Sequence, residues 1–242
     1  MRNNLSALNV YIKKNTKSEV VTQLLYGETF RCIENKKNWI KIKNNIDGYV
    51  GFIKRRKFLK KEKSTHKVCN LYAILYSKPN VQTNKKISFG SRIKALEIKK
   101  NFIKFDNNWI KKSDLKKINF KTKNIFKNIN KFLNVKYKWG GKHFKGIDCS
   151  ALVQLFFNFN NKYCPRDAKD QIKYFKKKIL LKNIKKNDLI FWKGHVAIAI
   201  SNKYLMHAYG PFKKTVIMSI KNTINRIYKT ADLKVIGIRR PM

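Results

Sequence analysis

One cysteine and two histidines in the second half of the chain have the types and spacing that a thiol-dependent hydrolase needs. Cys149 follows a glycine-containing turn and opens the apolar segment CSALVQLFFNF, which has the pattern of a buried helix. A helix N-terminus favours a thiolate, because its unpaired N–H groups and the helix dipole attract negative charge. His195 and His207 lie on two successive apolar strand-like segments joined by a short turn. Antiparallel pairing places them side by side, so His195 can act as a base that His207 orients.

Each of these residues also has a simpler interpretation. A lone cysteine at the edge of an apolar helix is usually an inert packed side chain, and a lone histidine on an apolar strand is usually packed as well. One cysteine and two histidines could instead bind zinc and leave the fourth position open. The spacing contains no compact ligand pair, so we predict no metal and no cofactor.

The first half of the chain has the pattern of short strands broken by turns. Apolar and polar residues alternate, with Gly27 and the Asp47-Gly48 pair as turn signals. A Trp-Ile step occurs at residues 39–40 and again at residues 109–110, which indicates a loose repeat. We therefore predict two small all-β barrels, at residues 1–62 and 63–119.

The periodicity changes near residue 120. Apolar residues at helical spacing predict helices over 124–135, 149–159 and 166–177. Strand-like segments return over 188–220, and helices followed by an antiparallel sheet are typical of an α+β domain. We predict that this domain covers residues 120–242.

The composition is that of a folded but very basic protein. Of 242 residues, 43% are hydrophobic, and 57 Lys and Arg against 13 Asp and Glu give a net charge of +44. Such a charge can attract polyanions, including nucleic acid. A nucleic-acid-binding protein concentrates its charge on one face, whereas these lysines are spread over every segment. We therefore attribute the charge to compositional bias and expect no nucleic-acid partner.

The cysteines and the N-terminus indicate a reducing compartment. The four cysteines lie far apart and form no recognisable disulfide framework. The segment MRNNLSALNV has no continuous apolar stretch typical of a secretion signal, and no later run is long enough to cross a bilayer. These features predict a cytoplasmic, soluble protein without a membrane partner; a periplasmic or extracellular location is the alternative.

Several separated motifs follow one another in the second half of the chain. They are Tyr137-x-Trp139-Gly140-Gly141, Gly146 to Val153, Pro165-Arg166-Asp167-Ala168 with Gln171, Asp188 to Trp192, Gly194 to Ile198, and Met206-His207-Ala208. Together they resemble the NlpC-type, papain-like cysteine peptidases, which cleave peptides of bacterial cell-wall murein. The similarity covers residues 120 to 240 in order, and the front half is more loosely similar to the paired bacterial SH3-like domains of some members.

The resemblance implies a catalytic set. Cys149 would be the nucleophile, His195 the base and His207 the polar third member. Tyr137 matches a position whose hydroxyl approaches the thiol, and Asp148 matches a residue that lines the substrate site. Ser150, on the other side of the nucleophile, matches a second lining position.

Further substrate contacts are implied by the same resemblance. Arg166 and Asp167 match a Pro-Arg-Asp segment, and we expect Asp167 in the substrate pocket. In related three-domain enzymes the first barrel presents an acidic group to the free amine of the substrate, and Glu28 in the turn LLYGE is our candidate, with Tyr49 placed similarly. Ordinary turn and strand roles for Glu28 and Tyr49 stay open.

Two residues depart from the family pattern, and two tryptophans lie within its motifs. Ala151 stands where glycine is usual, which is a small change, and Ala168 stands where many relatives have serine, which removes a hydroxyl. We expect Trp139 and Trp192 to be core aromatics rather than substrate contacts.

The resemblance implies hydrolysis of the bond between γ-D-glutamate and a diamino acid in a murein peptide. The absence of a secretion-type segment favours short peptides with a free N-terminal L-alanine (L-Ala-γ-D-Glu-diamino acid) during recycling, cleaved by a monomer. One alternative is an exported endopeptidase that acts on intact peptidoglycan. A second is a polyanion-binding protein on an inactive peptidase fold, which draws on the charge alone.

Overall fold

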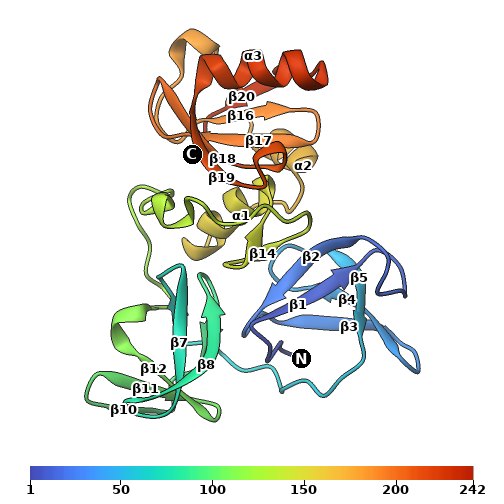
Figure 1. The fold of residues 1–242 in the computed structure, drawn as a ribbon. Coiled ribbons are helices and arrows are strands. Elements are labelled where there is room, and N and C mark those ends of the chain that lie inside the picture. The colour runs from blue at the N-terminus through green and yellow to red at the C-terminus, as the bar shows by residue number, and fades with distance from the viewer. Residues whose placement is uncertain (242) are drawn as a thin grey trace.

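The protein has three units that meet at a common centre (Figure 1). The computed structural model describes residues 1–241. Two β-rich units lie side by side below the third, which carries the helices and contacts both of them (Figure 1). Within the described residues no helix is long and apolar enough to cross a membrane.

The first unit is one antiparallel sheet of five strands with the order β2-β1-β5-β4-β3. Alternation in β4 turns Ile40 and Ile42 inward, where they pack with Leu24, Phe30 and Ile53. Its strands are β1 (Ala7–Tyr11), β2 (Val20–Leu25), β3 (Phe30–Asn35), β4 (Trp39–Asn44) and β5 (Val50–Lys54).

The second unit contains a five-stranded sheet, β10-β11-β12-β7-β8, and a three-stranded sheet, β13-β6-β9. Ile87, Ile103, Phe105 and Ile110 form its core. Its elements are β6 (His66–Val68), β7 (Tyr72–Lys78), β8 (Val81–Ser88), β9 (Arg92–Ile93), β10 (Glu97–Lys99), β11 (Phe102–Phe105), β12 (Asn108–Lys111), the 3₁₀ turn η1 (Lys112–Asp114) and β13 (Leu115–Lys117). The all-β character predicted for the front half is confirmed, while the domain boundaries stay a prediction.

The third unit places helices around an antiparallel sheet with the order β19-β18-β17-β16-β20, which confirms the predicted α+β arrangement. Its elements are η2 (Ile129–Phe132), β14 (Lys142–His143), β15 (Gly146–Ile147), α1 (Cys149–Phe159), α2 (Ala168–Tyr174), η3 (Leu181–Asn183), β16 (Leu189–Trp192), β17 (His195–Ala199), β18 (Tyr204–Tyr209), η4 (Gly210–Phe212), β19 (Lys214–Ser219), α3 (Ile220–Ala231) and β20 (Gly237–Arg239).

Both faces of this sheet are covered. Phe191 and Val196 point into the core that contains α1, whereas Trp192 and Leu205 point into the core that contains α3. Most side chains of α1 are apolar on every face of the helix, and every residue of α1 is buried. The packing of α1 therefore fixes the position of its first residue, Cys149.

The helix predicted over residues 124–135 is wrong, because only the short 3₁₀ turn η2 forms there. Asn128 has a positive φ of 65°, and Asn134 one of 63°. Asparagine tolerates this left-handed backbone, which an α-helix cannot contain. Phe126, Ile129 and Phe132 still pack into the core beside α1, so apolar spacing alone suggested a helix.

Buried polar contacts join the three units. Lys142 of the third unit forms an ion pair with Glu28 of the first at 2.8 Å, and both side chains are almost completely buried. Lys67 of the second unit donates to backbone carbonyls of Ile118 and, in the third unit, of Phe159. Burial lowers the pKa of Lys67 to about 8. Carbonyl partners on several segments offset the cost of burying this ammonium group.

Candidate active site

Cys149 is the first residue of α1 and is only 6% exposed. Asp148 is the N-cap residue, and its side chain accepts a hydrogen bond from the backbone N–H of Ala151 at 2.8 Å. The backbone N–H groups of Val196 and Ser150 approach the thiol closely enough to lower its pKa. The helix start predicted from the sequence is therefore confirmed, and the thiol lies against the start of β17.

The net electrostatic effect on the thiol is nonetheless unfavourable to a thiolate. Burial, followed by the nearby Asp148 carboxylate, raises the pKa of Cys149 to about 12. The helix N-terminus and the backbone donors act in the opposite direction but are outweighed. The thiol is thus protonated at neutral pH until a base removes its proton.

The two predicted histidines lie side by side, as the strand pairing requires. The Nε2 atom of His195 is 2.8 Å from the Nδ1 atom of His207. If the Nε2–H group of His195 donates to His207, the Nδ1 atom of His195 is unprotonated and can accept a proton from the thiol. His207 is fully buried and stacks on Tyr209, with ring centroids 4.6 Å apart.

Both imidazoles are neutral in this environment. Burial lowers the pKa of His195 to about 4, although the Asp148 carboxylate acts in the opposite direction. Burial also lowers the pKa of His207 well below its ordinary value. A neutral His195 is the protonation state that a general base needs.

Asp148, Ser150 and Arg166 form one buried hydrogen-bonded network. The Arg166 guanidinium donates to both carboxylate oxygens of Asp148, at 3.0 and 2.5 Å, and to the Ser150 hydroxyl at 2.9 Å. Its Nε atom also donates to the Thr22 hydroxyl of the first unit at 2.9 Å. Burial disfavours the charged guanidinium, but Asp148 raises the pKa of Arg166 overall. These side chains hold one another in place.

A cavity of about 330 Å³ opens at Cys149 between the first and third units. Asp148, Ser150, Arg166, Asp167 and Tyr49, all predicted to contact substrate, line it. Tyr137, His195, His207 and Glu28 do not line it.

One end of this cavity gathers acidic groups, although the cationic Arg166 and Lys169 also line the cavity. The Tyr49 hydroxyl donates to Asp167 at 3.2 Å, and Glu19 is close enough to influence Tyr49 electrostatically. Burial and the Asp167 charge raise the pKa of Tyr49. Burial also raises the pKa of Asp167, against the effect of Arg166. Two carboxylates and a phenol therefore face one volume.

Tyr137 lies close to the thiol although it does not line the cavity. Burial raises the pKa of its hydroxyl, and the next causes are the charges of Cys149 and Asp148. That its hydroxyl approaches the nucleophile stays a prediction.

The position expected for Glu28 is wrong. Its carboxylate forms the buried ion pair with Lys142 and also accepts the backbone N–H of Leu25, so it stabilises the join between two units. Glu19, the residue just before β2, is the acidic residue of the first unit that lines the cavity. Nothing in the sequence near Glu19 distinguishes it from a surface carboxylate, so the sequence alone does not indicate its place in the cavity.

Trp139 also differs from expectation, whereas Trp192 does not. Trp192 is a buried core residue, but Trp139 is 59% exposed and lines the cavity. The Trp139 indole N–H donates to Glu19 at 2.5 Å. This contact joins the third unit to the acidic end of the cavity.

Gly140 allows this close approach of the two units. It has a φ of +67°, and a Cβ atom there would lie 1.9 Å from the backbone oxygen of Val20 in the first unit. Any side chain would push the units apart, so the Trp-Gly-Gly segment needs glycine at this position.

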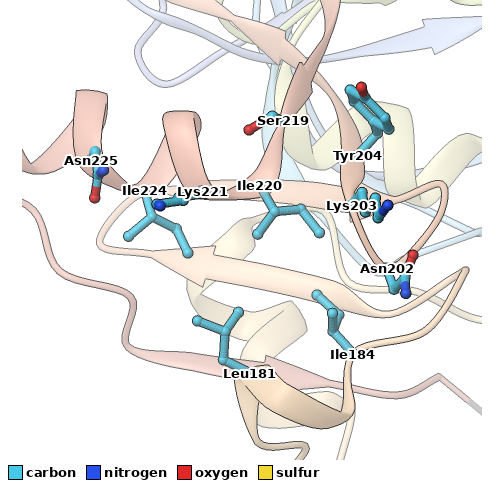
Figure 2. A pocket seen from close by; sticks show the side chains of 10 residues that line it. All are labelled: Leu181, Ile184, Asn202, Lys203, Tyr204, Ser219, Ile220, Lys221, Ile224 and Asn225. Atoms are coloured by element: carbon cyan, nitrogen blue, oxygen red, sulfur yellow. The ribbon is translucent and has the colours of Figure 1, made fainter.

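A second cavity, of about 600 Å³, lies on the opposite face of the sheet from α1. Figure 2 shows Leu181 and Ile184 facing Ile220 and Ile224 across it. Its lining combines these apolar side chains with polar and lysine residues and includes no cysteine, histidine or carboxylate side chain. The chemistry therefore belongs to the cavity at Cys149. Within residues 1–241 no cluster of three His, Cys, Asp or Glu side chains could hold a metal ion.

Known proteins resemble this chain in both sequence and fold. It is 25% identical over 229 residues to "Dipeptidyl-peptidase 6" of Lysinibacillus sphaericus, a match that covers 83% of this chain and 84% of the relative. It is 36% identical over 83 residues to "Probable endopeptidase NlpC homolog" of Haemophilus influenzae, covering 33% of this chain and 44% of that relative.

A solved structure has the same three-unit fold. It is an NlpC/P60 family protein from Bacillus cereus with a TM-score of 0.84 and 19% identity, covering 99% of this chain and 98% of the other. The predicted fold class, a papain-like NlpC-type domain behind small all-β barrels, is thereby confirmed.

Two parts of the sequence match known families directly. Residues 10–57 match the bacterial dipeptidyl-peptidase SH3 domain, and residues 134–235 match the NlpC/P60 family. The chain therefore contains an NlpC/P60 domain, preceded by a bacterial dipeptidyl-peptidase SH3 domain.

Proposed function

We propose that the protein is a cysteine peptidase that hydrolyses the bond between γ-D-glutamate and a diamino acid in murein peptides with a free N-terminal L-alanine. The products are L-Ala-D-Glu and the remaining amine. The name of the Lysinibacillus relative, a dipeptidyl-peptidase, supports removal of a dipeptide. We place the reaction in the cytoplasm, where such short peptides would be recycled.

The acidic end of the cavity is the observation that carries this proposal. Glu19, Tyr49 and Asp167 line the same volume as Cys149. Two carboxylates favour a cationic group, and the N-terminal ammonium of a short peptide is such a group. A cavity of about 330 Å³ that is bounded by the first unit has room for few residues before the cleaved bond.

The chain's own residues account for the chemistry. His195 accepts the thiol proton as the Cys149 sulfur attacks the γ-carbonyl carbon, and backbone N–H groups at the start of α1 hold the oxyanion. The protonated His195 then donates that proton to the leaving amine, which leaves a thioester on Cys149. Water hydrolyses the thioester and restores the thiol. His207 holds His195 in the tautomer that these transfers need.

The tripeptide L-Ala-γ-D-Glu-diaminopimelate is the direct test of this function. We expect mass spectrometry to detect L-Ala-D-Glu after incubation with the wild-type protein. The Cys149→Ala variant should form no product, whereas Cys32→Ala, which removes an exposed cysteine outside the site, should cleave normally.

Intact murein sacculi are the matched second substrate. Their L-alanine amine is bound in an amide, so the acidic end of the cavity would face no ammonium group. Release of peptides from sacculi without cleavage of the free tripeptide would reject the recycling role and favour a wall endopeptidase.

Glu19→Gln should selectively impair cleavage of peptides with a free N-terminus. Loss of a charged hydrogen-bond partner should raise KM for the free tripeptide by about 10- to 100-fold. The slow cleavage of the N-acetylated tripeptide should not change, because this peptide carries no ammonium group. Steady-state kinetics with both peptides measures the difference, and an equal loss on both would remove Glu19 from amine recognition.

Glu28→Gln is the matched control for that variant. It removes a carboxylate from the same unit, but from the buried pair with Lys142 rather than from the cavity. We expect a lower free energy of unfolding and an unchanged ratio of kcat/KM for the two peptides.

The pH profile of kcat/KM should have an unusually wide plateau. The reactive free enzyme carries one proton on the Cys149–His195 pair. Burial lowers the pKa of His195 from 6.5 to about 4 and raises the pKa of Cys149 from 9.0 to about 12. Protonation of His195 therefore inactivates the enzyme only below pH 6.5, and loss of the Cys149 proton only above pH 9.0. We expect the acid limb between pH 4 and 6.5; a midpoint above pH 6.5 would contradict the assigned neutral pair.

A further inference from the structure

A third cavity lies where the three units meet, away from Cys149. Its volume is about 570 Å³, within the range typical of small-molecule sites, which often occur at domain interfaces. Ser6 lines it from the first unit, Lys86 from the second and Phe144 from the third. No residue of this lining belongs to the cavity at Cys149.

The cavity carries unbalanced positive charge. Lys85, Lys86 and Lys145 line it, and among the residues that the structure describes none of their ammonium groups has a carboxylate within 4 Å. The one carboxylate of the lining, Asp106, is already bound by the Arg2 guanidinium at 2.9 and 2.5 Å. An anion therefore fits this site better than a cation.

A rigid wall is already formed on one side. The Nε2 atom of His143 lies 2.7 Å from the Ser6 hydroxyl, and that hydroxyl donates to the backbone oxygen of Lys86. The Nδ1 atom of His143 accepts the backbone N–H of Lys145 at 3.3 Å. These partners require a neutral His143 that donates from Nε2. Burial lowers the pKa of His143 to about 4, in agreement with this tautomer. The wall thus joins all three units without adding charge.

Aromatic side chains offer a surface for the body of a ligand. The centroid of the Phe144 ring lies 4.1 Å from that of His143 and 5.2 Å from that of Tyr72. The ammonium group of Lys86 lies 4.4 Å from the centroid of the Tyr72 ring. Phe144 is half-buried and lines the cavity. A ring or apolar group can pack there while its anionic group faces the lysines.

We propose that this junction cavity binds a small organic anion, with a phosphate or carboxylate group on Lys85, Lys86 and Lys145 and an apolar body against Phe144. Such a ligand contacts all three units at once. Binding therefore favours the assembled fold over the unfolded chain.

Isothermal titration with phenyl phosphate and with benzoate tests the proposal. The full-length Cys149→Ala protein removes peptidase activity from the measurement, and a constant ionic strength of about 0.15 M suppresses general attraction to a +44 chain. We expect saturable one-to-one binding and a higher midpoint of thermal unfolding with the bound probe. Stronger binding of phenyl phosphate assigns a phosphate ligand, and stronger binding of benzoate a carboxylate.

Matched triple variants separate a built site from surface charge. Replacing Lys85, Lys86 and Lys145 by Gln should weaken binding by about tenfold or more, because charge-assisted hydrogen bonds are lost. The control, which replaces the exposed Lys54, Lys57 and Lys127 by Gln, carries the same change in charge and should bind as before.

The thermal midpoint without probe confirms that each variant is folded. Lys145→Gln alone, at an exposed position, provides a milder test if the triple variant is destabilised. Equal weakening by both triple variants, or uptake that never saturates, would overturn the proposal.

Discussion

The buried ion pair between Asp148 and Arg166 is the interaction on which the site depends. Asp148 caps the helix that begins at Cys149, and Arg166 binds both oxygens of that carboxylate. Since Arg166 also donates to Thr22, the same guanidinium fixes the first unit against the helix start. Removing either charge leaves the other buried and unpaired, at a cost of about 3–5 kcal/mol. The position of the Cys149 nucleophile is thus coupled to the packing of the first unit, which closes one side of the cavity.

Burial has opposite consequences for structure and for chemistry at this site. It packs Cys149 into the core beside α1, yet it removes the water that would stabilise a thiolate at Cys149 and an imidazolium at His195. In our proposal the thiol proton therefore moves to His195 only when substrate is bound. Negative charge then appears only as the Cys149 sulfur attacks the carbonyl carbon. Backbone N–H groups near the sulfur are already oriented toward that charge.

Local sequence patterns correctly predicted those parts of the fold that depend on short segments. The start of α1 and the pairing of the two histidine strands follow from apolar periodicity, a cap residue and a short turn. The helix predicted near residue 128 failed because its apolar spacing was right but its asparagines adopt a left-handed backbone.

Contacts between distant segments could not be predicted in the same way. Glu19 and Trp139 are 120 positions apart, and only the packing of two units brings them together. For the same reason Glu28, the acidic candidate chosen from the sequence, proved to face Lys142 instead. Predicting which unit surface covers the cavity needs the assembled fold, since turn carboxylates look alike in sequence.

Trapping the acyl-enzyme would show whether Cys149 is the nucleophile. Wild-type protein would be acid-quenched during turnover of L-Ala-γ-D-Glu-diaminopimelate and analysed by intact-mass and peptide-map mass spectrometry. We predict an L-Ala-D-Glu adduct, linked as a thioester, on Cys149. An adduct on Cys32, Cys69 or Cys164, or undiminished turnover by Cys149→Ala, would contradict it.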